Sequence, residues 1–143
     1  MGVRKEWRVI SGDAPDSNTS AVLGDAQSGM ENWVLTNISC TISGQVGGTL
    51  DLYLQRFDDG LGVWVDWVHF AQVAAGASDV TYMIPGTVAA ADIYTVGVGT
   101  TVALAADAYT GGHQGSQVRA YAVCGTGTST GATVTCSLLG TLS

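Results

Sequence analysis

Charged side chains are scarce in this sequence. Only 12% of the 143 residues are Asp, Glu, Lys or Arg, and Lys5 is the single lysine. A nucleic-acid-binding protein needs a basic stripe that releases counterions from phosphates, whereas this chain has five basic residues and a formal net charge of −7. We therefore expect no nucleic-acid partner. A surface that is uncharged over large areas suits close packing against other protein subunits.

Long hydrophobic runs are also missing. No apolar stretch approaches the ~18–20 residues that a membrane-spanning helix needs, and Met1–Ile10 contains no apolar core of a secretory leader. We therefore expect no membrane partner, and synthesis in a cytoplasm.

The cysteines are few, and no two of them form a CxxC pair. Cys40, Cys124 and Cys136 fall on the apolar phase of their predicted strands. In a reducing compartment such residues behave as small buried hydrophobes. We predict three free, buried thiols; a disulfide between two of them is possible, but no spacing indicates it.

Sequence patterns for catalysis and cofactor binding are missing as well. The chain has no GxSxG, no HExxH and no Ser-His-Asp order, and the glycine-rich tract 125–131 lacks the lysine of a phosphate-binding loop. His69 has no His, Cys or acid at metal-ligand spacing, so we predict a structural or surface role. His113 lies in a glycine-rich loop, a position suited to an interface contact. These observations predict a protein without catalytic residues, metal or cofactor.

What the sequence does contain is alternation of apolar and polar residues with period 2. In the clearest case, Trp33–Ser43, one phase is apolar and the other polar, and Leu50, Leu52 and Leu54 likewise alternate with polar neighbours. The predicted strands are Glu6–Ile10, Trp33–Ser43, one from Leu50, Val63–Val73, Asp79–Ile84, Ile93–Val98, Thr101–Ala106, Gln117–Cys124 and Ala132–Leu139, the last two forming a terminal hairpin. Thr87–Asp92 is either a helical turn or a loop. Short strands at this spacing, without a convincing helix, predict one all-β domain over residues 21–143, an antiparallel β-sandwich or jelly roll.

The first 20 residues have a different character. They hold three of the five basic residues, Arg4, Lys5 and Arg8, followed by a polar, turn-rich segment, Ser11–Ser20. We predict an extended N-terminal arm over residues 1–20. Its basic cluster is either a solvated terminus or a surface that docks, together with Trp7, on an acidic partner.

The stretch from Phe57 to Trp67 holds two acids, two glycines and two tryptophans. Asp58-Asp59-Gly60-Leu61-Gly62 lies between two strand patterns and is rich in residues that tolerate positive φ, so it predicts a hairpin loop. A calcium loop would need acids at alternate positions and a glutamate twelve residues after the first ligand. Trp64 and Trp67 fall on opposite faces of the following strand. Either they are core residues that need no function, or at least one of them is exposed or lies at an interface.

Two segments carry a resemblance to small virion subunits of tailed bacteriophages. The first is Asp51-Leu52-Tyr53-Leu54-Gln55-Arg56-Phe57-Asp58-Asp59-Gly60 with the Trp64 strand after it, and the second runs from Gln117 to Leu138. The likeness lies in pattern and composition over roughly two-thirds of the chain. Within that group the chain most resembles a capsid decoration, or cement, protein.

The resemblance implies a non-enzymatic structural protein that binds the outer surface of an assembled capsid. Its partners would be the major capsid protein and further copies of itself, as a homo-oligomer (dimer or trimer), and its location would be the capsid exterior of the virion after synthesis in the host bacterial cytoplasm. Two rival functions remain: a tail, neck or baseplate component, and a carbohydrate-binding β-sandwich that uses Trp64, Trp67 or Tyr53 as stacking platforms.

Overall fold

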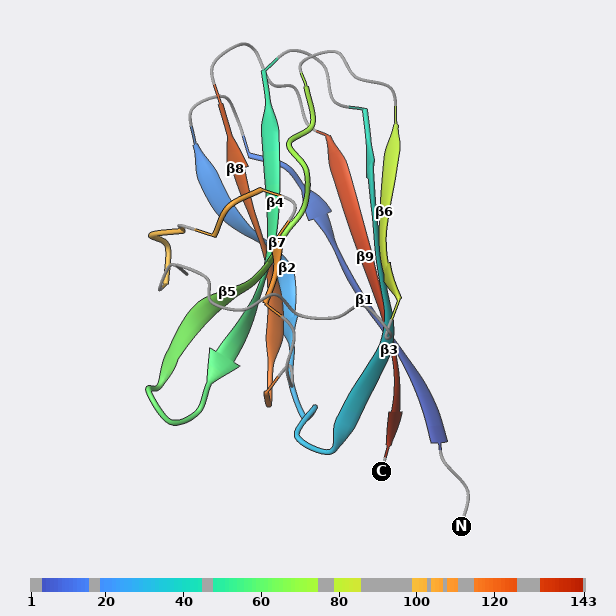
Figure 1. Ribbon diagram of the computed structural model, residues 1–143. Helices are drawn as coiled ribbons and strands as arrows, with labels where there is room; N and C mark the ends of the chain where they lie inside the picture. The colour runs from blue at the N-terminus through green and yellow to red at the C-terminus, as the bar shows by residue number, and fades with distance from the viewer. Residues whose placement is uncertain are drawn as a thin grey trace.

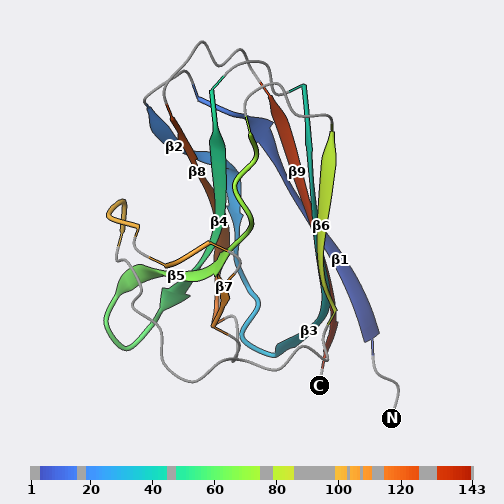
Figure 2. The same ribbon diagram turned by 45° about the horizontal axis from the view of Figure 1, so that its top comes forward.

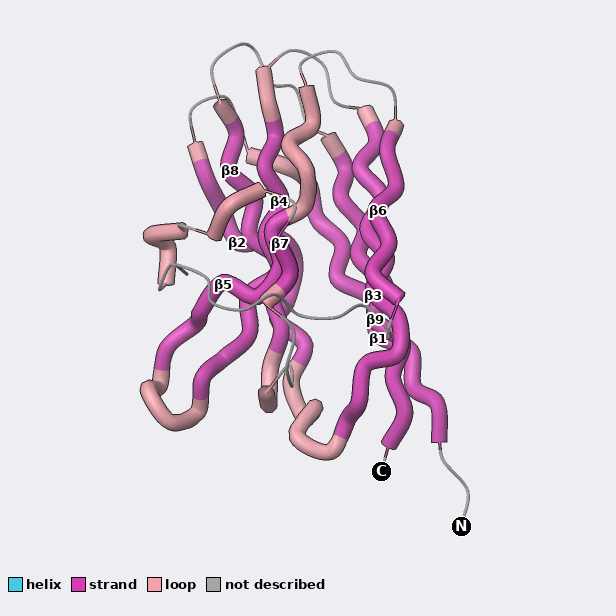
Figure 3. The backbone as a smooth tube through the Cα atoms, in the orientation of Figure 1, coloured by secondary structure: helices cyan, strands magenta, loops and turns pink. Residues whose placement is uncertain are grey.

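The computed structural model describes residues 4–15, 19–44, 48–74, 79–85, 99–102, 104–106, 108–110, 115–125 and 132–142. Over these residues the chain forms strands in two layers, and none of the described residues is helical (Figures 1 and 3). The strands are β1 (Arg4–Asp13), β2 (Ser20–Gln27), β3 (Trp33–Ser43), β4 (Leu50–Asp58), β5 (Val63–His69), β6 (Val80–Pro85), β7 (Ala108–Tyr109), β8 (Val118–Cys124) and β9 (Thr133–Leu142).

The strands make two antiparallel sheets that pack face to face (Figure 2). The four-stranded sheet has the order β1-β9-β3-β6, and the five-stranded sheet has the order β2-β8-β4-β5-β7. The predicted all-β sandwich is therefore confirmed.

The strand pairs are nested along the chain. β4 pairs with β5, β3 with β6, β2 with β8 and β1 with β9, all antiparallel. This is the pattern of one long hairpin whose two arms are folded over into two layers. Pairing of β9 with β3 and of β8 with β4 then joins the pairs within each sheet.

The core lies between the two inner faces and follows from the period-2 pattern. Ile38, Cys40 and Ile42 on β3 and Leu50, Leu52 and Leu54 on β4 are all buried. The three cysteines are free and buried, as predicted. Cys40 lies directly across from Cys136 in the β3–β9 pair, and burial, together with the neighbouring Cys136 thiol, raises the pKa of Cys40.

The predicted hairpin loop at Asp58-Asp59-Gly60-Leu61-Gly62 is also confirmed. The amide of Gly62 donates to the Asp58 carbonyl at 2.7 Å, and the Asp58 carboxylate accepts from the Leu61 amide at 2.9 Å. Gly62 has φ 71°, a conformation that favours glycine.

The N-terminal segment corrects the sequence-based prediction. Arg4–Asp13 is not an extended arm but an edge strand, paired with β9 over its whole length. The prediction also missed β2 within Ser20–Gln27. Apolar and polar residues do not alternate regularly along β2. Leu23 is its buried residue, and the β2–β8 register shifts between Leu23 and Gln27.

Three further sequence-based assignments differ from the structure. The terminal hairpin is wrong, since β8 and β9 lie in opposite sheets. The strand from Val63 ends at His69, and Val73 makes a separate bridge with Leu50. The described part of Thr101–Ala106 is not a strand. Thr87–Asp92 and Ile93–Val98 lie outside the described residues.

Candidate functional site

The outer face of the five-stranded sheet carries a buried polar cluster. Across β4 and β5, Tyr53 lies opposite His69, Leu54 opposite Val68 and Gln55 opposite Asp66, which leaves Trp67 as the extra residue of a β-bulge. The bulge shifts the side-chain phase along β5. As a result Asp66 and His69 share the outer face with Tyr53 and Gln55, although three positions separate the first two.

Gln55 is the centre of this cluster and is fully buried. Its Nε2 donates to Asp66 Oδ1 at 2.9 Å and to the Gly99 carbonyl at 2.9 Å. Its Oε1 accepts from Arg119 Nε at 2.8 Å. The other oxygen of Asp66, Oδ2, accepts from the Leu104 amide at 3.0 Å. The buried carboxylate is thus held by hydrogen bonds, as buried charges must be.

His69 ties the same face to the segment that crosses it. Its Nδ1 lies 2.6 Å from the Leu104 carbonyl, its Nε2 lies 2.9 Å from Asp51 Oδ1, and its ring stacks on Tyr53 with centroids 3.9 Å apart. The two ring nitrogens therefore each face an oxygen acceptor, the Leu104 carbonyl and the Asp51 carboxylate.

Two pKa values follow from this arrangement. Burial by itself raises the pKa of Asp51, but hydrogen bonds from His69 and Gln72 and the charge of His69 outweigh it, so the pKa lies below its ordinary value. Burial, with the carboxylates of Asp51 and Asp66 nearby, raises the pKa of Tyr53 to about 12.

The chemical role of the cluster is to fasten one segment to the sheet. Gly99, Leu104 and Thr110 are each hydrogen-bonded to side chains or backbone of β4 and β5. Gln55, Asp66 and His69 are all buried beneath this segment. In the part of the chain that the structure describes, no three His, Cys, Asp or Glu side chains gather as a metal site.

Trp64 and Trp67, both predicted interface residues, make contacts within the molecule. Trp67 is buried, and its ring packs edge-on against Tyr109. Trp64 is half-buried, with the Arg119 guanidinium 4.6 Å from its ring centroid and Phe57 against its edge. Tyr53 is buried too. Of the stacking platforms expected of a carbohydrate-binding sandwich, Trp67 and Tyr53 are therefore covered, whereas Trp64 keeps part of its surface exposed.

The outer face of the four-stranded sheet is different, because it carries most of the exposed large hydrophobic side chains of the described residues. Six large hydrophobic side chains are exposed among the described residues, and four of them lie on this face: Trp7 (61% exposed), Val9 (46%), Val34 (51%) and Met83 (63%). The remaining strand positions on the face are mostly Ser, Thr and Asn. We call this surface the open face.

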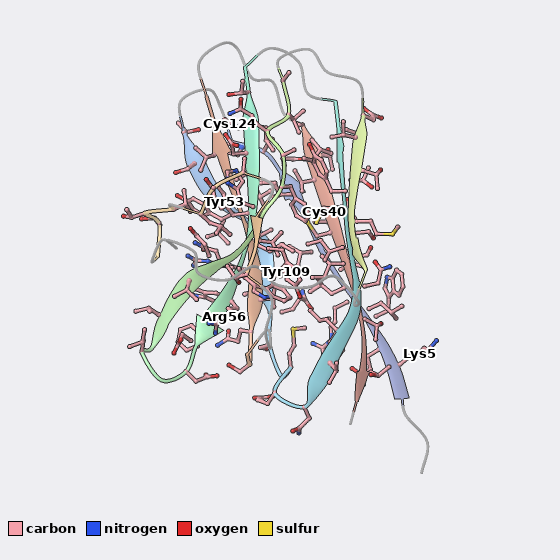
Figure 4. The ribbon with its side chains drawn as sticks, viewed as in Figure 1. Lys5, Cys40, Tyr53, Arg56, Tyr109 and Cys124 are labelled. Carbon is pink, nitrogen blue, oxygen red and sulfur yellow. The ribbon has the colours of Figure 1, made fainter. Side chains whose placement is uncertain are left out.

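The predicted basic cluster does not exist as one surface. Lys5 and Trp7 are exposed on the open face, and Lys5 points away from the body near the start of β1 (Figure 4). Arg8 faces the other side of β1, where it donates to the Ser28 carbonyl at 3.0 Å, lies 3.6 Å from the Glu6 carboxylate and covers the Trp33 ring. The backbone of Arg4 pairs with Leu142. His113 lies outside the described residues.

The alternation along β4 placed Asp51, Tyr53 and Gln55 opposite the buried leucines, but it did not indicate that a distant segment covers them. The open face did leave a signal at three positions: Trp7 and Val9 share one phase of β1, and Met83 stands on a phase that is otherwise polar. Val34 left none, because it lies on the apolar phase of Trp33–Ser43 and the register shift between Leu35 and Asn37 changes the face on which it lies. Apolar residues on a polar phase mark a surface that meets another molecule.

No family model, curated protein or solved structure matches this chain. Among the described residues, no helix is long and apolar enough to cross a membrane.

Proposed function

We propose that this protein is a non-enzymatic structural subunit of a tailed-phage virion, which binds the outside of the capsid as a decoration (cement) protein. The observation that carries the proposal is the open face, on which four of the six exposed large hydrophobic side chains of the described residues gather. Exposed apolar surface of this kind is typical of protein–protein contact.

The strand order gives further support. A jelly roll is a long hairpin folded over into two sheets, and the pairing of β1 with β9 and of β4 with β5 has this arrangement. The two-residue strand β7 is an addition at the edge of one sheet. Jelly rolls occur in viral capsid and lectin domains. The lectin alternative is less favoured here because Trp67 and Tyr53 are buried. Fold analogy alone does not assign a function, so the proposal needs a direct test.

The test is the location of the protein in virions of the phage that encodes it. Filled heads and tails would be separated by density, and the chain identified in each fraction by mass spectrometry. The proposal expects it in heads, at a fixed ratio to the major capsid protein, and released before the shell disassembles. Its presence in tails would favour the tail, neck or baseplate alternative, and absence from both fractions would end the virion proposal.

A second test measures attachment directly. Purified protein would be mixed with capsids that lack it and sedimented. Saturable co-sedimentation, with capsids that then withstand higher temperature, is the expected result. Capsids that sediment alone would contradict the proposal.

A further inference from the structure

The open face is arranged in rows that run across the strands. The central row contains Val9, Ser137, Ser39 and Met83, and rows with Trp7 and with Ser11 lie on either side of it. Lys5 and Asp13 occupy the two ends of the same strand, each four positions from Val9. Among the strand residues of this face, these two are the ionisable side chains, and they carry opposite charges.

The face is large enough for a specific contact. Four strands spaced by about 4.8 Å are about 19 Å wide, and the eight residue steps from Lys5 to Asp13 span about 27 Å. Two such surfaces in contact would bury about 1,000 Å², which is near the lower bound for a specific interface.

The distribution of charge on the protein indicates which partner fits the open face. The chain has a net charge of −7, so two copies repel each other over most orientations. The interior of the open face holds no acid that would meet another acid, which makes it the surface on which two copies can approach. The two charged ends, one positive and one negative on the same strand, are the property of a self-complementary surface.

We propose that two copies of this protein pair through the open face, about a two-fold axis that crosses the strands at Val9. The axis reverses the strand direction of the second copy. It therefore brings Lys5 toward the partner's Asp13, Trp7 toward the partner's Ser11, and Val9 toward the partner's Val9. Sheets packed in this way stay within about 30° of alignment, an offset that the long Lys5 side chain spans. The inference rests on the proposed function only in treating the open face as a protein contact. The pairing occupies that face, so a decoration protein that attaches as a pair would meet the capsid through another surface.

The first experiment measures self-association of the full chain by sedimentation equilibrium, at concentrations from about 1 to 300 µM. An interface of this size predicts a monomer–dimer Kd of about 1–100 µM. Val9→Glu places two carboxylates against each other on the axis and should raise Kd at least about 100-fold. Leu61→Glu adds the same charge at the exposed tip of the β4–β5 turn and should leave Kd within about 3-fold. Circular dichroism and the melting temperature would establish that both variants fold.

The second experiment exchanges the charges. Lys5→Asp and Asp13→Lys should each raise Kd by about 5- to 10-fold, because each replaces two attractive contacts by repulsive ones. The double variant K5D/D13K should restore Kd to within about 3-fold of the original. Lys5 and Asp13 are about 27 Å apart along one strand, so a contact within one copy cannot produce the rescue.

The outcomes separate this inference from the virion proposal. A chain that stays monomeric up to 300 µM, or a double variant that is no better than the single ones, overturns the pairing whatever the capsid experiments show. A chain that dimerises with the expected rescue, yet never appears in virions, supports the pairing and ends the capsid proposal.

Discussion

Gln55 shows how much one side chain can determine at the scale of the residue. Its amide uses both ends, since Nε2 donates to Asp66 and Gly99 while Oε1 accepts from Arg119. The three partners come from β5, the covering segment and β8. A buried polar group of this kind stabilises the fold while it is complete, and removal of one member leaves the others unsatisfied.

We expect Gln55→Leu to lower the free energy of unfolding by about 2–4 kcal/mol, because it removes the hydrogen bonds that Gln55 makes to the buried Asp66 carboxylate and to Arg119 Nε. Gln72→Leu is the matched control. Gln72 is exposed and donates to Asp51 at 2.8 Å, so its loss should cost less than about 1 kcal/mol. Urea unfolding at neutral pH measures both, and equal costs would show that burial of Gln55 is not the cause.

Asp51 predicts how stability depends on pH. Its pKa is lower in the folded protein than the ordinary value of 3.8, so the folded state favours the ionised carboxylate. That contribution is fully present above pH 3.8 and is lost as the pH falls through the lowered folded pKa. Asp51→Asn should therefore be less stable than the natural sequence at pH 6, and the difference should shrink when unfolding is measured near pH 2. A difference that does not change with pH would contradict this account.

At the scale of the element, β1 and β2 meet edge to edge where the two sheets join. Gln27 donates to the Val9 carbonyl at 3.3 Å, and Gly24 lies so close to β1 that a Cβ there would strike the Ser11 carbonyl oxygen. This contact covers part of the β1 edge, which would otherwise offer unpaired backbone groups to other chains.

Gly24→Ala and Gly29→Ala make a matched pair for this edge. Both glycines have positive φ, 59° and 72°, so both substitutions carry the same backbone strain of about 1 kcal/mol. A Cβ on Gly29 meets nothing within 4 Å, whereas one on Gly24 meets backbone. We expect Gly24→Ala to cost at least about 2 kcal/mol more in the free energy of unfolding. Equal melting temperatures would mean that the β1–β2 contact yields easily.

Removal of residues 1–13 tests whether β1 belongs to the domain. The deletion takes away the β9 partner over ten paired positions and the buried side chain of Ile10. We expect the truncated chain to lose cooperative thermal unfolding or to aggregate, since it exposes both the core and the β9 edge. Removal of residues 1–3 keeps β1 and serves as the control. A stable, cooperative domain without residues 1–13 would restore the interpretation of this segment as an arm.

At the scale of the whole molecule, the nested pairing places partners far apart in the chain. β1 pairs with β9, and β2 with β8, so large loops must close before these contacts form. We expect refolding on the order of 0.1–10 s, which is slow for a chain of this size. Stopped-flow fluorescence would follow it through the buried Trp33 and Trp67. Refolding complete within about a millisecond would contradict the expectation.

The period-2 pattern determined by itself that the protein is an all-β sandwich, where β3 lies, and that Asp58–Gly62 is a turn. These features depend on neighbours in the sequence: alternation selects the buried face of a strand, and turn residues end it. The same information predicted three buried thiols, because Cys40, Cys124 and Cys136 stand on apolar phases.

Tertiary structure decided what covers the outer face of each sheet, the face that points away from the core. Gln55 and His69 are buried because a segment some 40 positions away covers them, whereas Trp7 and Val9 stay exposed because nothing in the described chain does. The sequence likewise predicted that β8 and β9 form a hairpin, yet they lie in opposite sheets. Alternation states that a strand has two faces, but the layer against each face is chosen by contacts between distant segments, and a local pattern carries no information about those.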